Sequence, residues 1–271
     1  MDESSEHDSA GPLAVRVYKT LLDLLAVDRN DEERAPALYR ELMRLSSEER
    51  PKLLGDARFS SPSLALLLLE RSAELLDGDP MESERLAAFT LDLLGEAPRG
   101  RNSALRGLAW CRIGASRLVR GDLLRSEEAF SYGMTWLDQT PFESEMRAEA
   151  CFELGLLRKE QGRDDEALAL LNRASSIFEA LGLWAPSARA RYAAGALLAQ
   201  DVEIEPALTA LDEAARLAAA TAQPAVVLAA RQEMALAYAE IGKSGPAQRA
   251  LARAGRFVPR AGRLEQLRYQ R

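Results

Sequence analysis

The chain has 271 residues, of which 47% are hydrophobic and 28% charged, and its formal net charge is -7 at pH 7. This acidic balance argues against nucleic acid as the main partner, because phosphate binding draws on clustered positive charge. The longest apolar run covers only residues 64–69, which is too short to cross a membrane. We expect a cytoplasmic protein, because the acidic first residues lack the basic start and apolar core of a secretory signal.

The N-terminal part of the chain predicts a tail followed by a helical cap. Residues 1–10 hold four acids and little apolar surface, and we expect them to be disordered. Residues 11–60 are expected to cover the apolar end of the segments that follow. Amphipathic patterns predict two helices there, over 13–27 and 36–45, and we expect a short third helix around 48–54. Ser46 and Glu49 fit a capping box for the third of these helices.

A degenerate helix pair is predicted after the cap. Apolar periodicity covers 62–76 and 82–94, and the turn between them is rich in helix breakers. Ala87 and Leu91 match the second helix of the copies that follow, whereas the first helix carries no glycine.

A repeat of about 40 residues then becomes visible. Gly114, Gly155 and Gly195 each lie midway along an apolar-periodic stretch, 41 and 40 residues apart, and Ala235 stands another 40 residues on. A turn and a second apolar stretch follow each of them. Small residues at these positions let two helix backbones approach closely, while large residues fill the gap between one pair and the next. Because one helix pair cannot bury its faces alone, such pairs must stack.

The turns of the repeat carry their own signals. Gly162 and Gly242 stand just past a helix end, where we expect left-handed backbone conformation. The turn at 202–206 lacks a glycine, and we expect Pro206 to lie in the first turn of the helix that follows.

This repeat resembles that of the tetratricopeptide (TPR) family. The family places a large residue, Leu-Gly and Tyr on a first helix, and Ala, Phe or Leu, Ala and Pro on a second. The four copies match these positions with Trp110, Ile113, Gly114, Gly121, Ser126, Phe130, Gly133, Leu154, Gly155, Gly162, Ala167, Leu171, Ala174, Ala194, Gly195, Leu198, Ala207, Leu211, Ala214, Met234, Ala235, Tyr238, Gly242, Ala247, Leu251, Ala254 and Pro259. The resemblance implies an all-α fold, a right-handed α-solenoid of antiparallel helix pairs that forms a TPR-like superhelix.

The implied TPR-like array covers residues 61–260. Its five helix pairs are expected over 61–97, 103–137, 144–181, 185–221 and 224–258, and a basic C-terminal tail follows at 261–271. The period exceeds the family's usual ~34 residues, which implies longer helices or extended connectors such as 138–143 and 182–186. Repeats of this length resemble those of bacterial TPR regulators and adaptors.

The resemblance also implies a binding groove, because the first helix of each TPR pair lines the concave face. Projecting the repeat onto this chain gives a partner-binding set of Arg112, Glu149, Phe152, Glu153, Leu156, Lys159, Tyr192, Gln232 and Glu233. This mixed apolar and acidic set favours a protein or peptide partner that is amphipathic or extended and carries some basic residues. Phe152 and Tyr192 are the candidate anchors, with packing between repeats as the alternative role.

Residues for catalysis are scarce in this sequence. The single histidine, His7, lies in the acidic tail, which excludes histidine-dependent nucleophilic systems and nearly all zinc catalysis. Cys111 and Cys151 are expected to be buried apolar residues, with a redox or metal pair as the alternative. No glycine-rich phosphate loop is present. We therefore predict no enzyme, no cofactor and no metal.

The leading interpretation is a regulatory or assembly scaffold that binds protein or peptide segments in its groove. A peptide-sensing regulator and an obligate subunit of a larger complex are the alternatives, and a hydrolase that uses only carboxylates is a weaker one. An obligate subunit would dock through the apolar stripe at 64–69 or through the basic segment that begins at Arg249. That segment fits a solvated capping helix as well as a docking site.

Overall fold

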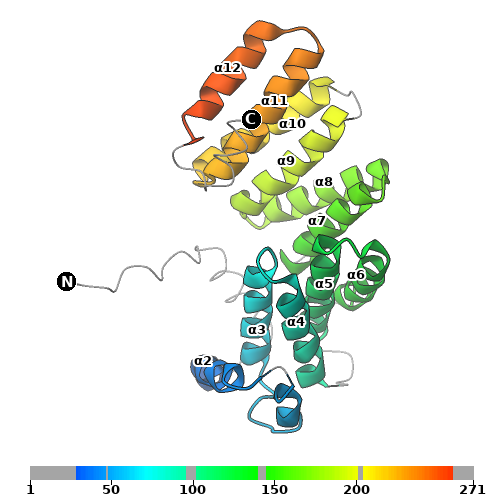
Figure 1. The fold of residues 1–271 in the computed structure, drawn as a ribbon, viewed down its shortest axis with the longest axis vertical. Coiled ribbons are helices and arrows are strands. Elements are labelled where there is room, and N and C mark those ends of the chain that lie inside the picture. Colours follow the sequence, from blue (N-terminus) through cyan, green and yellow to red (C-terminus); the bar gives the residue numbers. More distant parts are fainter. Residues whose placement is uncertain (1–28, 47, 96–101, 140–144, 201–203, 259–271) are drawn as a thin grey trace, which may run out of the picture. The chain divides into compact units, whose positions relative to one another are not determined.

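The computed structural model describes residues 29–46, 48–95, 102–139, 145–200 and 204–258 (Figure 1). Over these ranges the regular structure is helical, comprising the α-helices α2 to α12 and a short 3-10 helix, η1, with no β-strand. The chain divides into two compact units, Met1–Ala150 and Cys151–Arg271, and the boundary falls inside helix α7.

The first unit is a set of helices that pack against one another. Its elements are α2 (Arg29–Met43), η1 (Arg50–Leu53), α3 (Pro62–Leu75), α4 (Pro80–Leu94), α5 (Ser103–Val119), α6 (Leu123–Leu137) and the start of α7 (Glu145–Glu160). Besides the sequential contacts from α2 to α6, α3 contacts α5, so the first helices of two successive pairs lie side by side (Figure 1). Ser61, Asp79 and Asp122 cap α3, α4 and α6 by accepting backbone N–H groups.

The cap helix differs from its prediction. The sequence predicted a helix that starts at Pro36, but α2 begins at Arg29 and Pro36 lies inside it. A proline removes one backbone donor, and this loss is offset because Leu38 and Leu42 are buried in a core shared with α3 and α4. The expected helix at 13–27 and the two tails at 1–10 and 261–271 lie outside the described residues.

The short helix of the cap is fastened to the first helix pair by an ion pair. The predicted helix over 48–54 is the 3-10 helix η1, and the Glu49 carboxylate accepts the N–H of Ser46 at 3.1 Å and its hydroxyl at 2.9 Å. The next residue, Arg50, is buried and lies 2.7 Å from the carboxylate of Glu82 on α4.

The apolar stripe at 64–69 belongs to the interior of the first unit. Leu64, Leu66, Leu68 and Leu69 are at most 1% exposed, because α3 is surrounded by α2, α4 and α5. The prediction that this stripe docks on another subunit is therefore wrong.

The second unit repeats with a strict spacing. After the remainder of α7 come α8 (Asp164–Ala180), α9 (Trp184–Gln200), α10 (Ile204–Ala220), α11 (Pro224–Glu240) and α12 (Ser244–Gly255), whose first residues stand 20 positions apart. The helices α8 to α11 have 17 residues each. The prediction of an extended connector at 182–186 is wrong, because α9 already begins at Trp184, so the long period comes from long helices.

The repeated glycines lie where the two helices of a pair approach most closely. A Cβ built on Gly114 would lie 2.9 Å from the Phe130 ring, and one on Gly155 would lie 3.0 Å from Leu171. On Gly195 it would lie 2.9 Å from the side chain of Leu211 and 3.1 Å from its backbone nitrogen. These distances confirm that the small residues face the second helix of their own pair, and they explain why a larger residue is disfavoured there.

Several turns between helices contain a glycine in the left-handed backbone conformation, including the two for which the sequence predicted it. Gly162 and Gly242 have φ of 70° and 72°, and Gly121 and Gly182 share this conformation at 77° and 71°. The turn between α10 and α11 uses Ala222 instead, at φ 55°, which is unfavourable for a residue with a Cβ. As expected, Pro206 lies in the first turn of α10.

Replacing Gly195 by alanine is expected to lower the free energy of unfolding by roughly 1–3 kcal/mol, because the added methyl group would press on Leu211. Gly245→Ala on α12 is the matched control, since a Cβ there would meet its nearest atom at an ordinary 3.5 Å. Urea unfolding of both variants measures the difference. Equal stability of the two would show that close approach at Gly195 is not required.

Ala222→Gly is expected to raise the free energy of unfolding by about 0.5–1 kcal/mol, because glycine tolerates positive φ. In contrast, Ala219→Gly, at an exposed site three residues earlier in α10, should lower it by about 1 kcal/mol through lost helix propensity. Thermal unfolding of the two variants should therefore move in opposite directions. Parallel shifts would contradict the strained turn.

Candidate partner-binding surfaces

A row of side chains stands two positions before the small packing residue on the first helix of a pair. In the first unit these are Glu70 on α3 and Arg112 on α5. The place of the missing glycine in α3 is taken by Ser72, whose hydroxyl donates to the backbone carbonyl of Ser83 on α4 at 2.8 Å. Serine is small enough for this contact and satisfies its own hydroxyl there. The degenerate pair thus presents Glu70 at the position that corresponds to Arg112.

The predicted residues Arg112 and Glu149 are brought together in the first unit. The guanidinium of Arg112 donates to the Glu149 carboxylate at 2.7 Å, and the Arg112 side chain is 15% exposed. Arg112 also interacts electrostatically with Glu70 on α3 and with Glu145, one helical turn before Glu149 on α7. We call these four residues, Glu70, Arg112, Glu145 and Glu149, the inner acidic cluster. It sets three carboxyl groups from two helices around one arginine from a third.

Burial makes two carboxyl groups of this cluster, those of Glu70 and Glu145, difficult to ionise. It raises the pKa of Glu145 to about 8, with a further increase from the charge of Glu149 and an opposing effect from Arg112. It also raises the pKa of Glu70 to about 7, against the opposing charges of Arg71 and Arg112, while Glu74 adds to the increase. The cluster therefore carries an unfavourable excess of acid that a cation would relieve.

Two polar atoms of the cluster have no hydrogen-bond partner within the described part of the chain. They are Oε1 of Glu145 and Nε of Arg112, and both are buried. Such atoms are costly to leave unpaired. An approaching donor could satisfy the Glu145 oxygen directly.

The two predicted aromatic anchors lie in the second unit, and both have neighbours of their own. The guanidinium of Arg189 on α9 stands 5.6 Å from the centre of the Phe152 ring. Tyr192 packs against the core cluster that includes Leu211 and Met234. Each ring keeps part of its surface exposed. These contacts favour packing between repeats as at least one role of both rings.

Among the other predicted residues of the second unit, Lys159 acts electrostatically on Glu233. Burial raises the pKa of Glu233 on α11, the charge of Lys159 on α7 lowers it, and Glu240 raises it. The remaining predicted residues of the second unit are half-buried on the same two helices, namely Glu153, Leu156 and Gln232.

Sequence reasoning missed Glu70 and Glu145. A signal existed for both: Glu70 precedes Ser72 as Arg112 precedes Gly114, and Glu145 stands four residues before Glu149, on the same side of α7. Neither signal identifies a partner in another helix. Their association with Arg112 required the packed structure.

The described residues offer little for metal or disulfide chemistry. Within them, no group of three or more His, Cys, Asp and Glu side chains is arranged to hold a metal ion. Cys111 and Cys151 are buried and not joined in a disulfide, as expected. In the described part of the chain, no helix has the length and apolar character needed to span a membrane.

Several solved structures have a fold similar to that of this chain. No family profile and no curated protein matches the sequence. Among solved structures, BtubC (BKLC) from P. vanneervenii superposes with a TM-score of 0.61 at 16% identity, covering 91% of each chain. A Podosopora anserina protein described as a kinesin light chain with nearly identical TPR-like repeats gives a TM-score of 0.56 at 16% identity, covering 70% of this chain and 92% of its own.

A third similar structure is a Rap protein complexed with Competence and Sporulation Factor. Its TM-score is 0.58 at 13% identity, and the match covers 92% of this chain and 66% of the Rap chain. At such identities the likeness concerns the fold. The chain therefore has an all-α helical-repeat solenoid fold of the TPR type, as its sequence predicted.

Glu145→Gln is expected to remove part of a stability loss that the unmodified chain shows between about pH 5.5 and pH 8. The folded pKa of about 8 lies above the ordinary glutamate value of 4.5, so the folded chain binds more protons in this window and loses stability as pH rises. Because burial is partial, the slope should stay well below the ~1.4 kcal/mol per pH unit of one fully shifted proton.

Urea unfolding at the two pH values measures this effect. Glu128→Gln, which removes an exposed acid of α6, is the control and should leave the pH dependence unchanged. The same slope in the Glu145→Gln variant as in the unmodified chain would contradict the burial of this carboxyl group.

Proposed function

We propose that this chain is a protein- or peptide-binding scaffold that holds a basic segment of its partner against the inner acidic cluster. The observation that carries the proposal is the buried, unpaired Oε1 of Glu145, which lies in a cluster of three acids and one arginine. A lysine or arginine side chain of the partner would donate to this oxygen. Its positive charge would also favour the ionised form of Glu70 and Glu145, the two carboxyl groups whose pKa is raised.

The partner that best fits is an amphipathic or extended segment. The predicted groove residues of the second unit include Phe152 and Leu156, which are only half-buried and would contribute apolar contacts beside the charges of Glu153 and Lys159. The proposed binding surface includes the predicted residues of the second unit, Glu153, Phe152, Leu156, Lys159, Tyr192, Gln232 and Glu233. The rings of Phe152 and Tyr192 also contact neighbouring helices, so replacing them would alter packing as well as binding. Variants of the charged residues therefore test binding more directly.

The fold supports a binding role in a regulatory or assembly setting. The similar Rap protein was crystallised in complex with Competence and Sporulation Factor, so a solenoid of this kind can hold a partner. The proposal includes no reaction, because the carboxyl groups of the cluster surround Arg112 and are suited to recognise a cation. We also propose that the protein acts in the cytoplasm.

The test uses a labelled peptide of about twelve residues in which pairs of lysine alternate with pairs of leucine. We expect fluorescence polarisation at about pH 8 to show saturable binding that weakens about tenfold or more in the Glu70→Gln, Glu145→Gln double variant. Binding to the unmodified chain should also weaken as pH falls to about 6, because both carboxyl groups then hold protons.

The matched control is the Asp92→Asn, Glu128→Gln double variant. It removes two exposed acids from α4 and α6, so it changes the net charge equally without touching the cluster. Its affinity should stay within about twofold of that of the unmodified chain. Equal losses in both double variants would show general attraction to an acidic protein and would overturn the assignment of the cluster.

A further inference from the structure

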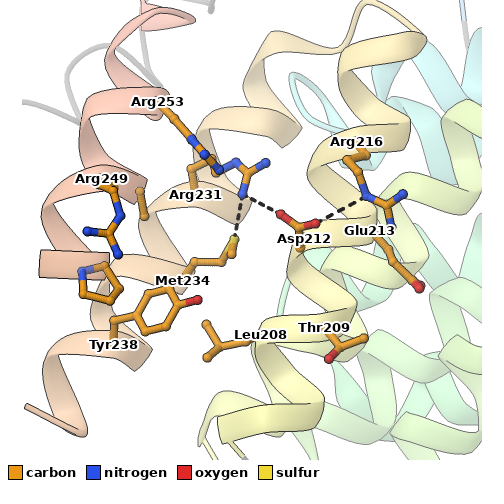
Figure 2. Close-up of a pocket in the computed structure, with 12 residues that line it drawn as sticks. Leu208, Thr209, Asp212, Glu213, Arg216, Arg231, Met234, Tyr238, Arg249 and Arg253 are labelled. Atoms are coloured by element: carbon orange, nitrogen blue, oxygen red, sulfur yellow. Dashed lines mark hydrogen bonds and ion pairs between the residues drawn. The ribbon is translucent and has the colours of Figure 1, made fainter. Parts of the chain in front are cut away.

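A cavity of about 410 Å³ lies in the second unit between α10, α11 and α12 (Figure 2). Its apolar side is built by Leu208, Met234, Tyr238 and Ala250. Met234 and Ala250 are buried members of the core cluster against which Leu208 and Tyr238 pack. The apolar wall is therefore held by the core of the unit, and a volume of this size accommodates one or two side chains of a partner.

The polar side of the cavity is dominated by arginine. Arg216 on α10, Arg231 on α11 and both Arg249 and Arg253 on α12 line it, against the acids Asp212 and Glu213 (Figure 2). The lining thus has twice as many guanidinium groups as carboxylates.

The acids of the cavity are already engaged by arginines. Asp212 is shared, because Arg231 donates to it at 2.8 Å and Arg216 lies 3.3 Å away. Glu213 pairs with Arg191 on α9, which is not part of the lining. Little negative charge is left to neutralise the α12 side of the cavity.

Arg249 and Arg253 supply the uncompensated charge. They stand four residues apart on α12, hence on the same side of that helix, and both are exposed. Neither has an ion-pair partner among the residues that the structure describes. Two forks of guanidinium donors at the edge of an apolar wall match the geometry of carboxylate groups.

This cavity is separate from the surface of the proposed function. At roughly 100° per residue, Arg231, Met234 and Tyr238 share one side of α11, whereas Gln232 and Glu233 lie on the opposite side. The two sets of residues also differ in charge, so they would select different partners.

We propose that the cavity is a second docking site, which binds an acidic segment of a protein partner. One apolar side chain of that segment enters the cavity, and the segment carries carboxylates on both sides of this side chain. The apolar side chain covers Leu208, Met234 and Tyr238, and the carboxylates pair with Arg249 and Arg253. An inorganic anion would satisfy the arginines but leave the apolar wall in water, which is why a peptide fits better than phosphate.

The experiment uses a labelled acidic peptide, Glu-Glu-Leu-Glu-Glu with blocked ends, in fluorescence polarisation at low salt. We expect saturable binding that falls about tenfold or more in the Arg249→Glu, Arg253→Glu variant and weakens as salt is added. The Lys243→Glu, Arg256→Glu variant makes the same charge change at exposed positions outside the cavity and should stay within about threefold of the unmodified chain.

Two further peptides test the apolar wall. Exchange of the central leucine for glycine should weaken binding at least about fivefold, and exchange of all glutamates for glutamine should abolish it. Equal affinity for the glycine peptide and the leucine peptide would overturn the proposal in favour of a general anion surface. So would competition in which millimolar inorganic phosphate or single-stranded DNA displaces the labelled peptide as effectively as unlabelled peptide does.

Absence of saturable binding to the unmodified chain, or equal losses in the two charge variants, would also overturn it. The Glu70→Gln, Glu145→Gln variant should bind the acidic peptide as the unmodified chain does. Failure of this site is therefore distinguishable from failure of the inner acidic cluster.

Discussion

Close approach of the two helices of a pair is the constraint on which the rest of the structure depends. At Gly114, Gly155 and Gly195 there is no room for a Cβ, because Phe130, Leu171 and Leu211 of the second helix occupy that space. This contact holds the two helices of a pair close together, and a pair that cannot bury its faces alone is stabilised by stacking. The side chains beside the glycines then fall into fixed positions on the first helix.

These fixed positions are what make a binding surface possible. Glu70 and Arg112 occupy equivalent places on neighbouring first helices, so charges far apart in sequence meet in a half-buried environment. In that environment ionisation is costly, which gives the inner acidic cluster its affinity for a cation in our proposal. The cavity of the second unit lies elsewhere, between α10, α11 and α12. Of these, α10 and α12 are the second helices of their pairs and α11 is a first helix. There the uncompensated charge is positive, so one repeat architecture offers surfaces of both signs.

The strict spacing of the second unit shows how local chemistry sustains this architecture. A helix of 17 residues followed by a short turn recurs every 20 positions, and Gly162, Gly182 and Gly242 adopt left-handed backbone at these turns. Ala222 takes the same conformation without the advantage of glycine. The packing of α10 and α11 on either side must therefore hold this turn in place.

The sequence by itself determined the fold type, because the interval between small residues and the glycines past helix ends are local signals that repeat. It also showed that Cys111 and Cys151 are suited to burial. It did not reveal that Pro36 lies within a helix or that residues 64–69 are covered on three sides, since both depend on which helices pack against them. The association of Glu145 with Arg112 and the arginine-lined cavity were likewise decided by the tertiary structure. Charges on different helices acquire shifted pKa values and unpaired atoms only when packing brings them together and removes water.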